Sequence, residues 1–199
     1  LYSTGHLILQ ILFNLQGSTF VAGCSVAGKV TSLANLAIAS LSSTMTVFSG
    51  QNLGAGNYRR LCRSAWLIPL SAGAITLSAG ILVTIFCNPL LALFTHDTAV
   101  LAFATRYIHI VLPFTWMYAI MNVIMCFANG IGEIKYPTIV NLFILWGVRI
   151  PVAYLLSRLG YGGYAMASVP LSFLAGMILM LFYFRTKRWA KLCALAKNE

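Results

Sequence analysis

The chain has 199 residues, of which 60% are hydrophobic and only 8% are charged. An ordinary soluble domain carries about 25% charged residues, which keep its surface wetted. Three acidic and 13 basic side chains cannot cover a body of this size, so the composition excludes a water-soluble domain and indicates a membrane protein. The net charge of +10 occurs in short clusters between long uncharged runs, which favours contact with an anionic membrane surface and predicts no binding of nucleic acid.

The individual reactive residues are sparse. Asp97, Glu133 and Glu199 are the only acids and lie far apart, which argues against a pair of catalytic carboxylates. The five cysteines are scattered singly without a CxxC pair, so we predict neither a disulfide framework nor a metal site. The chain begins at Leu1 within an apolar segment, and we expect it to be a fragment whose first part is missing.

Six charge-poor runs are long enough to cross a bilayer as helices, since about 20 helical residues span a hydrocarbon core of about 30 Å. Continuous apolar runs favour helices over a barrel, whose strands alternate apolar and polar residues. Lys29 separates the first two runs, and Arg149 falls deep inside the fifth. The predicted fold is therefore an all-α integral membrane protein with transmembrane helices over residues 3–22, 30–49, 62–87, 99–128, 137–158 and 162–184.

Basic residues are distributed unevenly between the two ends of these helices. By the positive-inside rule, the end that carries more of them is cytoplasmic. This predicts a transmembrane lobe over residues 1–184, followed by a basic cytoplasmic tail over residues 185–199. Nine basic residues lie on the predicted cytoplasmic side (Arg59, Arg60, Arg63, Lys135, Arg185, Lys187, Arg188, Lys191 and Lys197) and three on the other side (Lys29, Arg106 and Arg158).

Two glycine-containing turns lie at the predicted cytoplasmic end. The segment GQNLGAGNYRR, residues 50–60, closes the second helix, and NGIGEIKYP, residues 129–137, closes the fourth. Glycine reaches backbone angles with positive φ that residues with a Cβ avoid. A phosphate-binding loop would need a preceding strand, so we interpret both segments as structural turns. The turn residues are Gly54, Gly56, Gly130 and Gly132.

These turns, with the stretch PTIVNLFILWGVRIPVAYLLSRLGYGG that follows the second, resemble the C-terminal half of bacterial multidrug and toxic-compound extrusion (MATE) transporters. The similarity extends over nearly the whole chain. It implies one six-helix lobe of a two-lobe antiporter in the bacterial inner membrane, which uses a Na⁺ or H⁺ gradient and no cofactor to export cationic or amphiphilic organic compounds. The missing N-terminal lobe and the lipid bilayer would be its partners. The matching residues are GQNLGAGN at 50–57, Gly130, Gly132, Pro137, Asn141, Arg149, Pro151 and the turn from Gly160 to Gly163.

Polar side chains inside the predicted helices are the candidates for lining a substrate cavity. Gln10 and Asn14 lie four residues apart and so share one helix face, as do Tyr118 and Asn122. Such groups also form hydrogen bonds between helices, which is the alternative role for each. Arg149 is an intramembrane charge that either serves function or supports the fold near Pro151. The candidate cavity residues are Gln10, Asn14, Asn35, Tyr118, Asn122 and Asn141.

The resemblance departs from the family pattern at one position that concerns ion coupling. Some members carry an acid in the fourth helix of this lobe that takes part in cation binding, whereas residues 107–132 contain none. We therefore expect the coupling ion to bind mainly in the N-terminal lobe.

Two other classes remain open. A lipid-linked precursor or polysaccharide flippase of the same superfamily would line its cavity with several basic residues. A membrane-embedded enzyme, such as an acyltransferase, would need a supported histidine. The adjacent pair His96 and Asp97 belongs to no catalytic motif, so we predict no catalytic residue.

Overall fold

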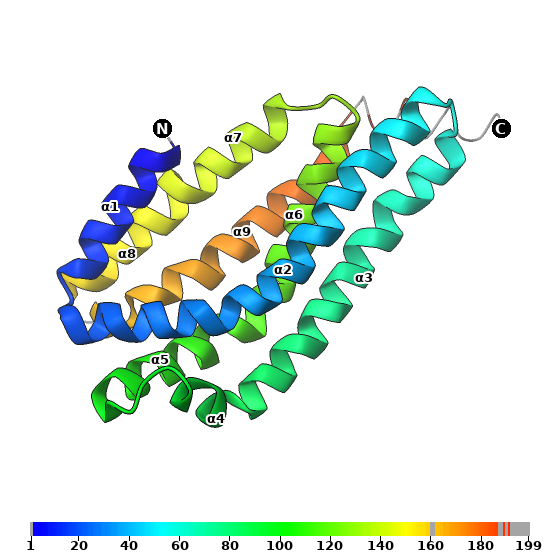
Figure 1. Ribbon diagram of the computed structural model, residues 1–199. Coiled ribbons are helices and arrows are strands. Elements are labelled where there is room, and N and C mark those ends of the chain that lie inside the picture. The colour runs from blue at the N-terminus through cyan, green and yellow to red at the C-terminus, as the bar shows by residue number, and fades with distance from the viewer. Residues whose placement is uncertain (1, 160–161, 187–188, 190, 192–199) are drawn as a thin grey trace.

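The computed structural model describes residues 2–159, 162–186, 189 and 191 of the chain. Every regular element in these ranges is a helix, which confirms the all-α prediction for them (Figure 1). Two 3-10 helices, η1 (Leu112–Phe114) and η3 (Gly162–Ala167), and a π-helical segment, η2 (Ile144–Arg149), join some of the α-helices. The α-helices are α1 (Tyr2–Asn14), α2 (Ser18–Gly54), α3 (Tyr58–Ile85), α4 (Cys87–Ala92), α5 (Thr98–Val111), α6 (Thr115–Gly130), α7 (Lys135–Phe143), α8 (Ile150–Arg158) and α9 (Ser168–Tyr183).

Some sequence predictions fall outside the described residues. These are most of the predicted tail, residues 185–199, and the start of the turn at Gly160.

Four helical segments among the described residues are long and apolar enough to cross a membrane: Tyr58–Ile85, Thr98–Gly130, Lys135–Arg158 and Tyr164–Tyr183. They coincide closely with the last four predicted spans. The two parts of α2, Ser18–Ser32 and Asn35–Gly54, meet at a bend of 50° and would count as a fifth span if taken together. Helix α1 has only 13 residues and is too short to count as a span. By length and composition, the described residues therefore contain four spans, or five with α2, and not the predicted six.

The predicted boundary between the first two helices is wrong. The expected helix over residues 3–22 ends at Asn14, and α2 begins at Ser18 and continues through Lys29. The chain reverses at Gly17, whose φ of 98° is open to a residue without a Cβ. Lys29 does not interrupt α2 because lysine is a good helix former, and its exposed ammonium lies 5.7 Å from the centre of the Phe94 ring.

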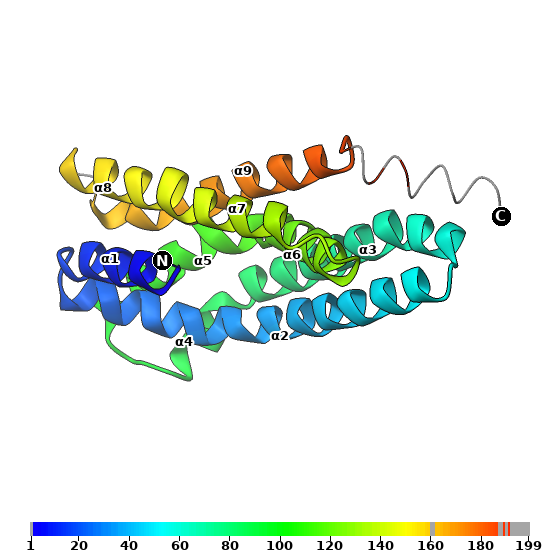
Figure 2. The same cartoon turned by 90° about the horizontal axis from the view of Figure 1, so that it is seen from above.

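Helix α6 forms the centre of the bundle. It packs against α2, α3 and α9, and Figure 2 shows it between α2 and α3 on one side and α7, α8 and α9 on the other. The side chains of Ala119, Val123 and Phe127 on α6 are completely buried in the largest hydrophobic core. A helix that is buried around so much of its circumference needs apolar residues on several faces, which explains its high content of such residues.

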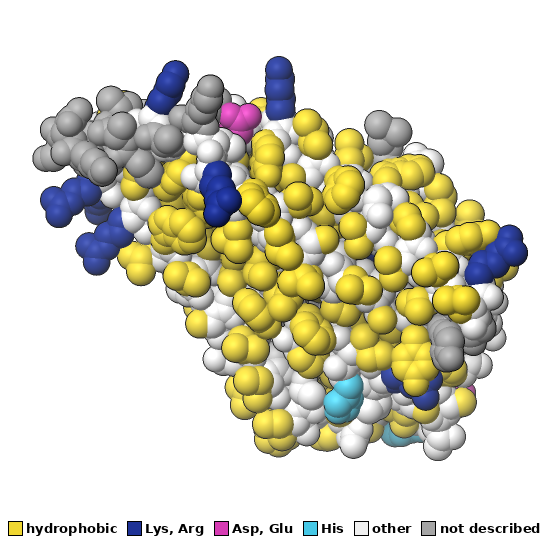
Figure 3. All heavy atoms as spheres, turned by 180° about the vertical axis from the view of Figure 1, so that it is seen from behind, with side chains coloured by type: hydrophobic (Ala, Val, Ile, Leu, Met, Phe, Trp, Pro, Cys, Tyr) yellow, Lys and Arg dark blue, Asp and Glu magenta, His cyan; other side chains and the backbone are white. Residues whose placement is uncertain are grey.

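One face of the bundle is largely apolar between two charged ends. Figure 3 shows hydrophobic side chains over the middle of one face, with Lys and Arg side chains toward its ends. This pattern is typical of a protein whose middle lies in hydrocarbon. Helix α3 contributes a long exposed apolar row: Trp66, Leu67, Leu70, Ile75, Leu77, Ile81, Leu82 and Ile85.

The two predicted glycine turns are present, but only one glycine in each has positive φ. Gly56 and Gly132 have φ values of 73° and 79°. Gly54 and Gly130 are the last residues of α2 and α6 and do not have positive φ. The prediction of positive φ was therefore wrong for Gly54, whereas Gly130 ends its helix as predicted. A Cβ at Gly130 would lie 2.5 Å from the carbonyl oxygen of Thr46, so Gly130 is required for the close approach of α6 to α2.

Candidate functional site

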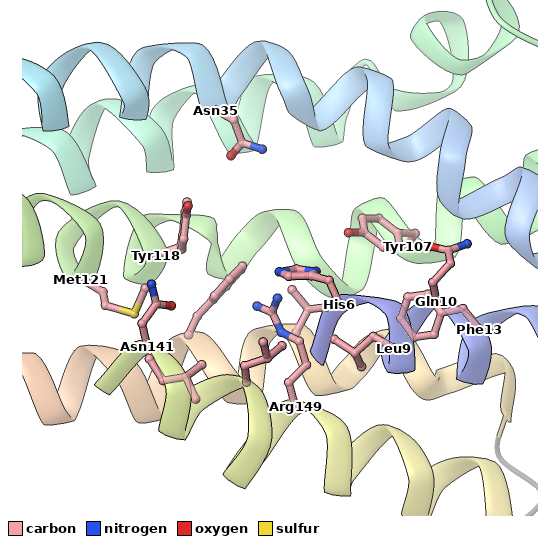
Figure 4. A pocket seen from close by; sticks show the side chains of 14 residues that line it. His6, Leu9, Gln10, Phe13, Asn35, Tyr107, Tyr118, Met121, Asn141 and Arg149 are labelled. Atoms are coloured by element: carbon pink, nitrogen blue, oxygen red, sulfur yellow. The ribbon is translucent and has the colours of Figure 1, made fainter. Parts of the chain in front are cut away.

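A cavity of about 380 Å³ is lined by residues of α1, α2, α5, α6, α7, η2 and α9 (Figure 4). Its volume falls within the range of about 300–1,000 Å³ that small-molecule sites occupy. Polar groups reach it from helices that are far apart in the chain, which only the folded bundle brings together. The polar lining residues are His6, Gln10, Asn35, Tyr107, Tyr118, Asn141 and Arg149.

Helix α1 supplies one wall of the cavity. His6, Gln10 and Phe13 follow one another at spacings of four and three residues, which places them on one helix face. The side-chain amide of Gln10 donates to Oδ1 of Asn14 at 3.2 Å. Asn14 therefore holds Gln10 in place without itself lining the cavity.

Arg149 enters the cavity from η2, which packs against α1. It is the last residue of η2, and Pro151 follows in the first turn of α8. Proline has no N–H and its ring clashes with the carbonyl four residues earlier, so the helix cannot continue here with regular hydrogen bonds. The π turn absorbs this irregularity, and π turns of this kind are frequent at functional sites.

The position of Arg149 is fixed by α9. Its Nε and one terminal nitrogen donate to Oγ of Ser172 at 3.2 and 2.9 Å. The guanidinium carbon lies 5.7 Å from the centre of the Phe173 ring, within the distance of a cation–π contact. Figure 4 shows the guanidinium directed into the cavity on the side of His6, which is close enough to interact with it electrostatically.

Asn122 joins two helices instead of lining the cavity. It accepts a hydrogen bond of 2.7 Å from Oγ of Ser42 on α2 and donates to the hydroxyl of Tyr118 at 3.3 Å. Tyr118 in turn packs against Phe173, with ring centres 5.0 Å apart. Asn122 thus connects α2 and α6 and positions a tyrosine that does line the cavity.

The structure brings together most of the predicted residues. Gln10, Asn35, Tyr118 and Asn141 line the cavity with Arg149, whereas Asn14 and Asn122 contact lining residues from behind. None of these placements tests a role in binding, which stays a prediction. The glycines of the turns lie at the end of the bundle and are structural.

Sequence reasoning missed His6 and the aromatic lining residues Phe13, Tyr107 and Phe173. His6 precedes Gln10 by four residues, a spacing that would have placed it on the same face. Tyr107 reaches the cavity through the packing of α5 against η3 and α2. Nothing in the sequence distinguishes an aromatic residue that lines a cavity from one that packs in the core.

Acidic side chains are absent from the described residues that line the cavity. Asp97 immediately precedes α5, where its Oδ1 accepts hydrogen bonds from the backbone N–H groups of Ala99 and Val100 at 2.9 and 3.4 Å and caps the helix. Glu133 lies in the turn between α6 and α7. The cavity therefore contains the positive charge of Arg149 and no carboxylate among its described lining residues.

A bundle of long apolar helices around a cavity with polar lining is the architecture of a membrane transport protein. The chain belongs to the MatE family, whose family model matches residues 1–155. This confirms the resemblance found in the sequence. It also sets aside the membrane-embedded enzyme, because the relatives that have a named function are multidrug resistance proteins.

The relatives come from several bacteria. The probable multidrug resistance protein YoeA of Bacillus subtilis is 27% identical over 162 residues, which are 79% of this chain and 34% of that protein. The probable multidrug resistance protein NorM of Thermotoga maritima is 24% identical over 100% of this chain and 43% of its own length. The corresponding protein of Haemophilus ducreyi is 29% identical over 90% of this chain and 40% of its own length. This chain therefore spans less than half the length of these relatives.

Proposed function

We propose that this chain is the C-terminal lobe of a cation-coupled antiporter that exports cationic or amphiphilic organic compounds. The observation that carries the proposal is the cavity lined by Gln10, Asn35, Asn141 and Arg149 inside a bundle with an apolar exterior. Polar groups at membrane depth are expensive to bury and by default mark a transport pathway. Family membership and the names of the relatives support export of organic compounds.

Six spans are part of this proposal. The two parts of α2 would form one span, and α1, which packs against α8, would contribute another beside the four long segments. The turns after α2 and α6 lie at one end of the bundle, and α4 lies at the other (Figure 1). Arg59, Arg60 and Lys135 belong to the end with the turns, which supports a cytoplasmic location of that end in the bacterial inner membrane.

A second lobe would cover the exposed face of α2. Beside the exposed Leu36 and Val47, α2 exposes several polar side chains, whereas the row on α3 is apolar. These polar residues include Ser40, Ser43, Thr44 and Gln51. A polar face is unfavourable against hydrocarbon and favourable against protein or an aqueous cavity. The length of the relatives, more than twice that of the matched region, supports an N-terminal lobe as the occupant.

The coupling ion would bind mainly in that N-terminal lobe. A Na⁺ or H⁺ site at membrane depth usually contains a carboxylate, and neither Asp97 nor Glu133 lines the cavity of this lobe. Gln10, Asn35 and Asn141 would then contribute neutral contacts to the substrate.

The flippase alternative is not favoured. Lipid-linked pyrophosphates would require several basic groups, and Arg149 is the formal charge among the described lining residues. The relatives with named functions are multidrug resistance proteins.

The test uses the protein encoded by the whole reading frame that contains this chain, reconstituted in liposomes. Export of the lipophilic cation tetraphenylphosphonium is measured after a Na⁺ gradient or a pH gradient is imposed. We expect export with one of the two gradients and none without a gradient. A protein that exports nothing with either gradient, or whose reading frame encodes no further spans, would contradict the proposal.

A further inference from the structure

The cavity of this lobe has the wrong charge for a compound that is only cationic. Arg149 brings a permanent positive charge into it, and no acid lines it among the described residues. The attraction or repulsion between charges is stronger in a protein interior than in water, because the effective dielectric constant is lower. We propose that the cavity binds aromatic compounds that carry a carboxylate or a similar oxyanion, with Arg149 as the group that binds the oxyanion. This inference rests on the proposed function and specifies its substrate class.

The side chain of Arg149 is already ordered by its contacts within the protein. The hydrogen bonds to Ser172 and the contact with the Phe173 ring fix the side chain from α9, so little conformational entropy remains to be lost when a ligand binds. A guanidinium is a planar fork of N–H donors that matches a carboxylate, and its charge persists at any physiological pH. Figure 4 shows this fork directed into the cavity.

The residues around Arg149 complete a binding site of mixed character. His6 reaches the cavity beside the guanidinium, and the amides of Gln10 and Asn141 offer further donors. The rings of Phe13 and Tyr118 present apolar faces to the body of a ligand. Tyr118 packs against Phe173, so an aromatic ring bound beside them would join an existing cluster.

The same arrangement accommodates zwitterions. The oxyanion of such a compound would lie at Arg149, while its cationic group would point toward the exposed side of the cavity near Asn35, away from the guanidinium. A cation that lacks an oxyanion, such as tetraphenylphosphonium, would gain nothing from Arg149 and would be repelled by it, so its binding would fall to the N-terminal lobe. The charge of Arg149 therefore selects among amphiphilic compounds.

The experiment compares two probes of similar shape and opposite charge, naphthoate and naphthylmethylammonium. Their binding to the protein encoded by the whole reading frame, in phosphatidylcholine nanodiscs, is measured by calorimetry. Replacing Arg149→Gln should weaken naphthoate binding about tenfold or more, because a hydrogen bond to a charged group is lost, and should leave naphthylmethylammonium unchanged or more tightly bound. The matched control is Arg158→Gln, since Arg158 is exposed and bonds Tyr154 at 2.8 Å outside the cavity; it should change neither affinity.

The variant Arg149→Lys separates a loss of binding from a loss of folding. It keeps the charge but not the planar fork, so we expect it to bind naphthoate more weakly than the native protein and more tightly than Arg149→Gln. Equal naphthoate binding by native protein and Arg149→Gln, or no naphthoate binding by the native protein, would overturn the inference. Gradient-driven export of tetraphenylphosphonium that persists in that case would leave the proposed function standing.

An anionic phospholipid offers the same oxyanion chemistry as the aromatic acid. The binding measurement is therefore repeated in nanodiscs of phosphatidylglycerol. Unchanged naphthoate affinity supports a site for soluble organic acids. Loss of naphthoate binding in these discs would assign the site to a lipid headgroup and overturn the inference.

Discussion

Gly56 and Gly132 occupy equivalent positions in two turns with the same hydrogen bonds. The N–H of Gly56 donates to the carbonyl of Leu53 at 3.2 Å, and that of Gly132 donates to Asn129 at 3.0 Å. In each turn the next residue donates to the carbonyl five positions earlier, at 2.9 and 2.8 Å. This is the Schellman pattern, in which the residue that follows the C-cap, here Gly56 or Gly132, has positive φ. The α2–α3 and α6–α7 turns therefore have the same Schellman structure.

Replacing Gly56→Ala should lower the free energy of unfolding by about 1 kcal/mol or slightly more, the cost of a left-handed conformation for a residue with a Cβ. Gly54→Ala is the matched control, because Gly54 is helical and a Cβ there would meet open space. The control should be neutral or stabilising. Thermal unfolding of the purified variants in detergent measures both. Equal effects of the two substitutions would show that the backbone angle of Gly56 does not matter.

Gly130→Ala should destabilise the bundle more than Gly56→Ala does. The new Cβ would clash with Ser49 and with the carbonyl of Thr46, so α6 and α2 would have to move apart. Forcing extra atoms into a packed interface typically costs about 1–3 kcal/mol. The control is Gly28→Ala on α2, where a Cβ meets nothing within 4 Å. A Gly130→Ala protein as stable as this control would contradict the close approach of the two helices.

The orientation in the membrane can be tested with single cysteines in a background without the native ones. Asn57 and Asn88 are both exposed and lie near opposite ends of the bundle. An impermeant thiol reagent added to intact cells should label Asn88→Cys and should reach Asn57→Cys only after the membrane is opened, because basic residues flank Asn57. The opposite labelling pattern would reverse the proposed orientation.

Neither described acid of this lobe should be required for ion coupling. Asp97→Asn should retain gradient-driven export and stability, because asparagine caps a helix about as well as aspartate. Asp97→Ala should export as well but lose about 1 kcal/mol of stability with the cap. Glu133→Gln should also retain export. A variant of either acid that reaches the membrane in normal amounts yet no longer couples export to the gradient would place the coupling site in this lobe.

The sequence predicted the helical class and most helix positions because long uncharged runs are sufficient to identify membrane helices. It failed between residues 15 and 30, where a charge was taken as the sign of a loop. Lys29 can remain in α2 because its long side chain carries the charge to the surface. The turn between α1 and α2 is at Gly17, which lies inside an apolar run where no charged residue indicates a turn.

The candidate site was predictable only in part, since polarity identifies residues that need a partner but not which partner they find. Asn122 and Asn141 look alike in the sequence, yet one bonds Ser42 across a helix interface and the other lines the cavity. The difference depends on how α2 packs against α6, which is a property of the whole bundle. Aromatic residues were harder still, because cores and cavities use the same ones.

The segment Ile144–Arg149 is a π turn, which has more residues in the turn than a regular helix. The direction in which the Arg149 side chain points therefore depends on the number of residues in this segment. Each residue of a regular helix turns the chain by about 100°. Deleting one residue from this segment would remove the extra residue of the wider turn and would rotate everything that follows by about that angle relative to α7. Arg149 would then leave Ser172 and face another part of the bundle. The charge in the cavity is thus specified by chain length as well as by residue type, and a single-codon deletion would remove it without replacing the arginine.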